Sequence, residues 1–331
     1  MPYNQGFRTP AQLTGVARGA FDAAYEGFGI ADLLPVVENF TLDYSFTVGQ
    51  SPLPAAAKFR SFNTPSMVNT VGQGATASGK LPPTSIRLHV DEYGQLKMYG
   101  QDDAIGAKFE EYAERNAQSI AYRLVLAAAE AVETGKISVS ERGLQFSVDF
   151  GRKAELTSDA SISWGSVDTA TPLADVEALK RVFKKRVAEV RLSDLSMSHL
   201  QRNATVIKRA MRRGTDLPDM VSQEDVRTVF RDFNLGNIIV VEDTVMDTDG
   251  EEVPVFSEDA VILSSGGQLG SAQVGVTAES LDSANGIAAT EAPGLFAGAL
   301  PTDDPQGFDV RVTGILLPVL SSANNTAVLK V

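Results

Sequence analysis

One stretch of the chain has no acidic residue, although the protein as a whole has a formal charge of −13. Residues 44–90 contain no Asp or Glu, and their basic side chains are Lys58, Arg60, Lys80 and Arg87, a charge of +4. Five prolines and four glycines in the same stretch disfavour a helix or a central strand over most of it. A segment this long without regular structure is uncommon inside a compact domain. We therefore expect it to extend from the body and contact a neighbouring subunit.

The segment that follows predicts one long amphipathic helix. Asp102 and Asp103 can cap its N-terminus, no proline interrupts the chain up to Thr134, and Gly135 stands where a left-handed residue commonly ends a helix. Apolar side chains recur at steps of three and four along one face: Ile105, Phe109, Tyr112, Ile120, Leu124, Ala128 and Ala131 or Val132. At roughly 1.5 Å per residue, such a helix is about 48 Å long. It would cross a whole domain as a rigid rod.

Charge is unevenly distributed in the second half of the chain. Residues 180–213 contain eleven Lys or Arg and two acids, a net charge of +9. Residues 214–309 contain nineteen acids and two basic residues, a net charge of −17. This asymmetry fits nucleic-acid binding, contact between basic and acidic parts of two copies, or solvated helix faces beside an acidic domain. The sequence leaves these interpretations open.

The order of the remaining elements predicts an α+β fold. Helices are predicted over 9–25, 195–211 and 224–230, and from Thr171 and Pro172 along an apolar stripe that reaches Val190. Strands are predicted over 85–90, 95–99, 144–150, 160–164, 237–241, 253–256 and 260–263, with turns at 92–94 and 247–251. Residues 266–275 predict a glycine-rich loop, and residues 310–331 an apolar strand, a turn with a proline and a last strand. There is no fixed-period repeat, and the order is not that of alternating βαβ units.

Motifs that could carry chemistry fail their context tests. Residues 74–80 begin like a phosphate-binding loop, but Leu81, Pro82 and Pro83 follow where a Ser or Thr and a helix are needed. The acids between residues 247 and 252 are too closely spaced for an EF-hand and fit an Asp-Gly hairpin turn. We therefore expect no nucleotide site and no metal site here.

The other reactive residue types give no stronger signal. His89 and His199 have neither a serine elbow nor a second histidine at the fourth position, and Trp164 is predicted to be a packing anchor. Cysteine is absent, which excludes disulfides and thiolate chemistry. No apolar run is long enough for a membrane span, and the first residues do not resemble a signal peptide. We expect a protein that is not an enzyme, with no cofactor and no membrane contact.

The order of these features resembles the tailed-bacteriophage major capsid proteins of the lambda-type, or major capsid protein E, family, which have the Hong Kong 97 capsid fold. The resemblance runs from about Phe40 to Val331. The matching segments are 150–152 before Trp164, 171–175 at a helix start, 237–245, 253–256, 259–263, the loop with Gly270 and Gly275, and 317–319 near the end.

The resemblance implies a division of the chain. It comprises an N-terminal arm over 1–43, an extended loop over 44–90, a peripheral domain over 91–170 with a spine helix at 103–134, an axial domain of mixed sheet and helix over 171–309, and C-terminal strands over 310–331 that return to the body. The implied function is a major capsid protein that assembles as pentamers and hexamers of an icosahedral shell around double-stranded phage DNA. Assembly in the host cytoplasm and localisation in the virion follow from that function.

The same resemblance suggests partners and contact residues. A separate scaffolding protein is expected because the chain has no long helical N-terminal extension; a portal protein, a decoration protein and nonspecific proximity to packaged DNA are further expectations. In the loop, the candidates for contacts between subunits are Lys58, Phe59, Arg60, Phe62, Met67 and Lys80. Nothing in the sequence establishes a covalent cross-link, so noncovalent assembly is predicted.

Three other functions remain alternatives. A shell subunit of a bacterial protein nanocompartment would share the loop and the long helix, and would contain protein cargo instead of DNA. A nucleotide hydrolase using Lys80 would need a helix after that residue. A nucleic-acid-binding module built on residues 180–213 would bind DNA as a monomer with steep salt dependence.

Overall fold

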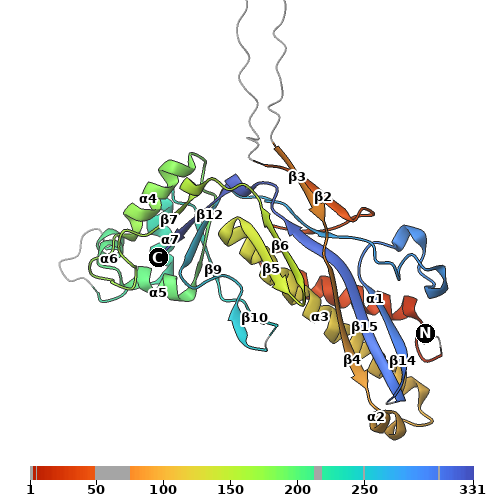
Figure 1. The fold of residues 1–331 in the computed structure, drawn as a ribbon. Helices are drawn as coiled ribbons and strands as arrows, with labels where there is room; N and C mark the ends of the chain where they lie inside the picture. Colours follow the sequence, from red (N-terminus) through yellow and green to blue (C-terminus); the bar gives the residue numbers. More distant parts are fainter. Residues whose placement is uncertain (1–2, 5, 49–74, 212–217, 249, 305) are drawn as a thin grey trace, which may run out of the picture.

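The computed structural model describes residues 3–4, 6–48, 75–211, 218–248, 250–304 and 306–331. Figure 1 shows an elongated molecule with two lobes. The first, which we call the spine lobe, contains the long helix and a curved sheet, and the second contains a shorter sheet with several helices. Each lobe has its own cluster of buried apolar side chains. The pattern of strands and helices is the mixed α+β order that the sequence predicts.

The sheet of the spine lobe is built around one long strand, β15 (Gln306–Val319). Along its first half β15 lies between β4 (Pro83–Val90) and β14 (Phe296–Asp303), and near its end it pairs with β13 (Ser271–Val274), all antiparallel. The short strand β1 (Val36–Glu38) adds to β13 in parallel. The predicted strand at 85–90 is thus confirmed and begins at Pro83, where the lost N–H can be tolerated at the first position of a strand.

Helix α3 (Asp102–Thr134) crosses this sheet as the predicted rod. All members of the predicted stripe are buried except Tyr112, which is partly buried. Gly135 ends the helix with φ 74°, the left-handed conformation expected there, whereas the N-cap is Gln101 and the two aspartates lie in the first turn. The Nδ2 of Asn116 donates to the carbonyl oxygen of Val310 at 2.9 Å, which fixes the helix against β15.

The N-terminal segment packs on its own subunit. Helix α1 (Pro10–Glu26) begins with Thr9 and Gln12 in a capping box, and Pro10 occupies the first helical position. Its buried face, which includes Leu13 and Phe21, lies against α3 and β14. The prediction of a helix at 9–25 is confirmed, and the apolar face of this helix is buried within its own subunit.

The second lobe contains a mixed five-stranded sheet. Its order is β7 (Thr157–Asp159), β16 (Thr326–Lys330), β12 (Ala260–Ser264), β8 (Glu189–Ser193) and β9 (Asn237–Val241). Its helices are α4 (Pro172–Phe183), α5 (Asp194–Arg202), α6 (Ala204–Ala210) and α7 (Gln223–Asp232). The outer strands are parallel to their neighbours, and β12 is antiparallel to both β16 and β8.

Three hairpins and short helices complete the fold. The hairpins are β2 (Asp43–Val48) with β3 (Ala75–Lys80), β5 (Lys136–Glu141) with β6 (Leu144–Asp149), and β10 (Thr244–Met246) with β11 (Glu252–Pro254). A two-turn helix, α2 (Glu92–Lys97), lies at one end of the molecule (Figure 1). Short 3-10 helices occupy Ala154–Leu156, Ser283–Asn285, Ala289–Glu291 and Ala323–Asn325.

Several predicted elements differ from the structure. The strand at 95–99 and its turn are wrong, because Asp91 caps helix α2 by accepting from the backbone N–H of Gly94 at 2.9 Å. The strand at 160–164 is wrong, since Trp164 is in a turn and the strand is β7. Helix α4 ends at Phe183, where the next residue is left-handed. Its predicted extension to Val190 fails because that residue packs from strand β8.

Other differences are smaller. The helix predicted over 195–211 is interrupted at Asn203, whose buried amide donates to the carbonyls of Val167 and Ala170 while its oxygen caps α6. The hairpin at 247–251 joins β10 to β11 and not β9 to β11. The loop at 266–275 includes strand β13, and Pro318 lies within β15 instead of in a turn.

Candidate subunit-contact surface

The stem of the acid-free loop is part of the spine lobe. Strands β2 and β3 pair from Asp43 opposite Lys80 up to the point where the loop leaves them. Tyr44 and Phe46 are buried, and the Phe46 ring lies 5.3 Å from the ring of Phe150. These contacts fix the paired strands β2 and β3 on the body. The stem is therefore a rigid attachment, and residues 75–80 belong to the fold.

Of the six candidate contact residues of the loop, Lys80 alone lies among the residues that the structure describes. Lys58, Phe59, Arg60, Phe62 and Met67 lie outside the described residues. Lys80, the sixth candidate, is exposed at the end of β3.

Large apolar side chains are exposed at the far end of the spine lobe. Helix α2 has no buried residue, and the exposed fractions of Tyr93, Leu96 and Tyr99 are 75%, 65% and 84%. We call these three residues the apolar tip. Exposed tyrosines and leucines grouped in this way mark a contact surface, because an isolated subunit gains nothing from leaving them in water. The sequence does not indicate the tip, because residues 95–99 are predicted to form a strand.

A second exposed apolar group lies beside the loop stem. Phe40 and Leu42, just before β2, are 65% and 49% exposed, and Val37 in β1 is 41% exposed. No sequence pattern distinguishes these residues, because apolar residues at a strand edge and apolar residues at a subunit contact have the same composition.

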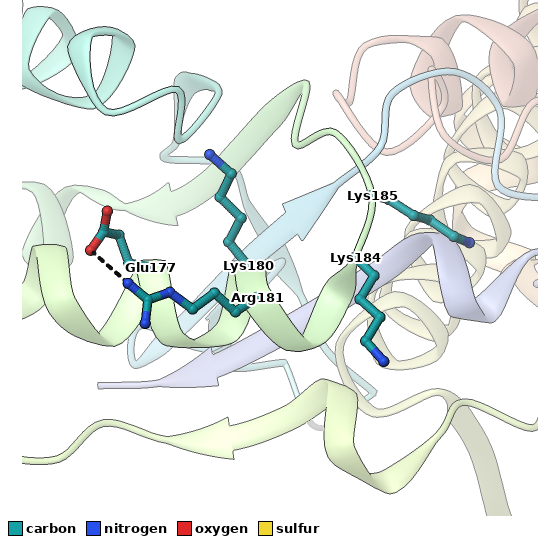
Figure 2. Close-up of a pocket in the computed structure, with 5 residues that line it drawn as sticks. All are labelled: Glu177, Lys180, Arg181, Lys184 and Lys185. Atoms are coloured by element: carbon teal, nitrogen blue, oxygen red, sulfur yellow. Dashed lines mark ion pairs between the residues drawn. The ribbon is translucent and has the colours of Figure 1, made fainter.

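A basic hollow lies at the end of α4 in the second lobe. It is lined by Glu177, Lys180, Arg181, Lys184 and Lys185, and has a volume of about 350 Å³. Figure 2 shows the cationic groups pointing in different directions, with Arg181 turned toward Glu177 and Lys184 turned away from Lys185. We call this set of five residues the cationic hollow. It corresponds to the start of the basic segment that the sequence indicates.

Two of these lysines form hydrogen bonds within their own chain. The Lys180 Nζ donates to the carbonyl oxygen of Asn234 at 2.7 Å. The Lys185 Nζ donates to the Asn324 carbonyl oxygen at 2.9 Å and to the Oδ1 of Asn325. Burial, and then the nearby charge of Lys153, lowers the pKa of Lys185.

An acidic hairpin stands apart from the sheets. The hairpin β10–β11 and the two residues before it carry Glu242, Asp243, Asp247, Glu251 and Glu252, which we call the acidic hairpin. Between Arg231 and Arg311 the sequence has no Lys or Arg at all. No group of three or more His, Asp or Glu among the described residues is arranged to hold a metal ion.

His89 belongs to a hydrogen-bonded group that joins two strands. The Nδ1 of His89 lies 2.7 Å from the Oδ1 of Asp309, and Arg87 donates to the other oxygen of the same carboxylate at 2.7 Å. His89 and Asp309 are register partners across β4 and β15, so the group joins two strands. Trp164 is fully buried, as predicted, and its Nε1 lies 3.4 Å from Asp175.

The other motif candidates fall on regular backbone. Residues 75–80 are strand β3, so the segment resembling a phosphate-binding loop does not enter a helix. None of the described helices is long and apolar enough to span a bilayer.

Comparison with known proteins connects this geometry to a family. The family model for the phage major capsid protein E matches residues 85–331. A comparison with curated protein sequences gives no match.

Two solved structures are similar over nearly their whole length. One is a protein assigned as the capsid protein of a prophage in Escherichia coli CFT073, with 15% identity, a TM-score of 0.66, and coverage of 98% of this chain and 99% of that one. The other is a phage-related protein from Bordetella bronchiseptica RB50, with 15% identity, a TM-score of 0.56, and coverage of 96% and 94%. At this identity the likeness shows a shared fold, which is the Hong Kong 97 type inferred from the sequence.

The spine helix and the late mixed lobe of the predicted order thus have an independent counterpart in both sequence and structure. The family match covers the spine helix, the acidic hairpin, the sheet of the second lobe and most of the sheet of the spine lobe. The chain therefore belongs to the phage major capsid protein E family and is a major capsid protein of a phage.

Proposed function

We propose that this subunit forms pentamers and hexamers of a closed icosahedral shell around double-stranded phage DNA. The observation that carries the proposal is the pair of exposed apolar groups, the apolar tip and the residues beside the loop stem, on a chain that belongs to a shell-forming family. Pentameric and hexameric rings are built from heterologous contacts, in which one patch meets a different patch. A subunit of this kind must expose at least two unlike surfaces.

The division of the chain also belongs to this proposal. It comprises the arm 1–43, the loop 44–90, the peripheral domain 91–170, the axial domain 171–309 and the returning strands 310–331. In the shell the loop would lie over a neighbour, with Lys58, Phe59, Arg60, Phe62, Met67 and Lys80 in contact with it. Exposed ion pairs contribute only about 0–1 kcal/mol each, so the apolar side chains must supply most of the stability.

The remaining partners are proposed on the same basis. The shell would form without covalent cross-links, with a separate scaffolding protein and a portal protein, and a decoration protein could bind outside. Assembly would take place in the host cytoplasm. The subunit would be a structural component of the shell and not an enzyme.

Assembly of purified protein tests the proposal. With the scaffolding protein present, size-exclusion chromatography with light scattering and electron microscopy should reveal closed particles of many subunits. A species that stays monomeric under every assembly condition would contradict it. Particles that contain protein cargo in place of DNA would favour the alternative of a bacterial nanocompartment.

Two variants separate the contact surfaces from the fold. Replacing all three residues of the apolar tip by Ser should leave the thermal unfolding of the free subunit unchanged and prevent particle formation. The control Leu281→Ser, at an isolated leucine that is 68% exposed, should leave both unfolding and particle formation unchanged. Deleting residues 51–73 and closing the gap with a short glycine linker should also abolish shells. That deletion spares β2 and β3, so loss of cooperative unfolding would instead place the loop inside the fold.

A further inference from the structure

The cationic hollow has two positive groups that are not committed to partners in their own subunit. The side chain of Arg181 is 81% exposed, and its acidic neighbour among the described residues is Glu177, at 3.9 Å. Lys184 is exposed and forms no ion pair with any residue that the structure describes. Lys180 and Lys185 are instead fixed on carbonyl and amide oxygens. Arg181 and Lys184 are therefore the groups available to an external anion.

The backbone holds these groups in place. Lys184 adopts φ 54° at the C-cap of α4, so the chain turns sharply after the helix. Lys185, the next residue, is tied to the Ala323–Asn325 turn between the two lobes. Because the backbone on both sides of Lys184 is held, its side chain projects from a fixed backbone position rather than from a free loop. An anion bound here would have to order the side chains of Arg181 and Lys184, but not the backbone that carries them.

The acidic hairpin has the opposite arrangement. Glu251 and Glu252 are exposed at the start of β11, and Asp247 accepts the backbone N–H of Glu251 at 3.0 Å, which orders the turn. The Glu252 carboxylate accepts a hydrogen bond from the hydroxyl of Thr244, at 2.6 Å. With no Lys or Arg nearby in sequence, the hairpin presents an ordered group of carboxylates to solvent.

The two surfaces are separate within one subunit. In Figure 1 helix α4 lies at the outer, upper side of the second lobe, whereas β10 projects from its lower side. Each chain therefore has one cationic and one anionic surface that do not neutralise each other. A ring of identical subunits brings unlike patches together in a one-to-one ratio, and complementary charge both steers the encounter and fixes its register.

We propose that Arg181 and Lys184 of one subunit bind Glu251 and Glu252 of the neighbouring subunit in the ring. This contact rests on the proposed assembly into pentamers and hexamers. The phosphates of DNA are the other anions that could fill the hollow. We favour the hairpin for two reasons. Each chain supplies one hairpin for each hollow. The like charges gathered on each surface also repel one another, and the opposite surface of a neighbouring subunit would neutralise them, in a subunit whose net charge is −13.

A charge exchange tests the contact. The variants Arg181→Glu/Lys184→Glu and Glu251→Lys/Glu252→Lys should each reduce the yield of particles at least about tenfold, because each places like charges opposite each other. The variant that combines all four changes should recover most of the parental yield. A matched control combines Arg181→Glu/Lys184→Glu with Asp32→Lys/Glu114→Lys, which restores the net charge at exposed sites elsewhere and should not recover assembly.

The outcomes are distinct. Recovery by the hairpin exchange and not by the control supports the contact, with circular dichroism confirming that every variant is folded. No recovery from the hairpin exchange, while the parent assembles, would overturn the contact and leave the proposed function intact. Normal empty shells from Arg181→Glu/Lys184→Glu that bind DNA less well would overturn it in favour of phosphate binding. A parent that never assembles would contradict the proposed function itself.

Discussion

Replacing Arg152 by Met should weaken the end of the spine helix. Arg152 follows strand β6, and its guanidinium donates to the carbonyl oxygens of Glu133, at 2.7 Å, and of Val132. These carbonyls belong to the last turn of α3, where helix oxygens have no partner within the helix and the dipole is negative. Methionine fills much of the same volume but provides no donor, so two acceptors lose their bonds.

The size of the effect follows from two opposing contributions. Two hydrogen bonds from a charged donor are worth about 3–6 kcal/mol together. Burial lowers the pKa of Arg152 to about 10. From a normal value of 12.5, this corresponds to roughly 3 kcal/mol of disfavoured charge. The variant recovers that cost, and the free energy of unfolding should therefore fall by up to about 3 kcal/mol.

Thermal unfolding of the unassembled subunit measures this change. A loss of up to about 3 kcal/mol should lower Tm by up to roughly 4 °C in a chain of this size. Lys153→Met is the matched control, since the neighbouring side chain is 65% exposed and its replacement should change stability by less than about 0.5 kcal/mol. Hydrogen exchange should increase around residues 131–137 in the Arg152 variant alone. Equal melting of the two variants would refute the argument that the guanidinium holds the helix end.

Three further changes test other parts of the fold. Leu124→Asp places a carboxylate in the fully buried stripe of α3 and should cost several kcal/mol, seen as insoluble or unassembled protein; normal assembly would contradict the helix register. Asp149→Asn should lower stability at neutral pH: a hydrogen bond from Lys136 depresses the pKa of Asp149, so its contribution is present above the unfolded value and disappears as pH falls, and parent and variant should converge in acid unfolding curves below about pH 4. Gly270→Ala should destabilise the subunit by at least about 1 kcal/mol in urea titrations, because a Cβ would stand 2.0 Å from the Val319 carbonyl oxygen; an unchanged midpoint would show that the backbone moves freely there.

Local signals in the sequence were sufficient where one element determines its own structure. The stripe of α3 and the left-handed Gly135 follow from periodicity and from the conformational freedom of glycine, and both are confirmed. The start of α4 at Pro172 is confirmed because proline favours the first position of a helix. The family resemblance rested on the order of such elements, so it survived errors in several of them.

The errors arose where tertiary contacts decide. The apolar spacing after α4 continues as if the helix reached Val190, yet that residue completes a buried sheet at β8. The alternation around Leu96 resembles a strand, but the cap at Asp91 and the absence of a neighbouring strand allow a short exposed helix. The cationic hollow depends on a turn from Asn324 that lies far away in sequence, so only the excess of positive charge could be predicted.

The pairing of β4 with β15 gives the shell a path for mechanical force. The loop stem continues from β3 through two prolines directly into β4, which pairs with β15 from Pro83 to Val90. In antiparallel strands the hydrogen bonds run across the strand direction, so a pull along β4 loads the bonds of the whole ladder together instead of opening them one by one. The Asn116 bond then passes the load to the spine helix. Tension applied to the loop by internal pressure would therefore be carried through this ladder to the spine helix.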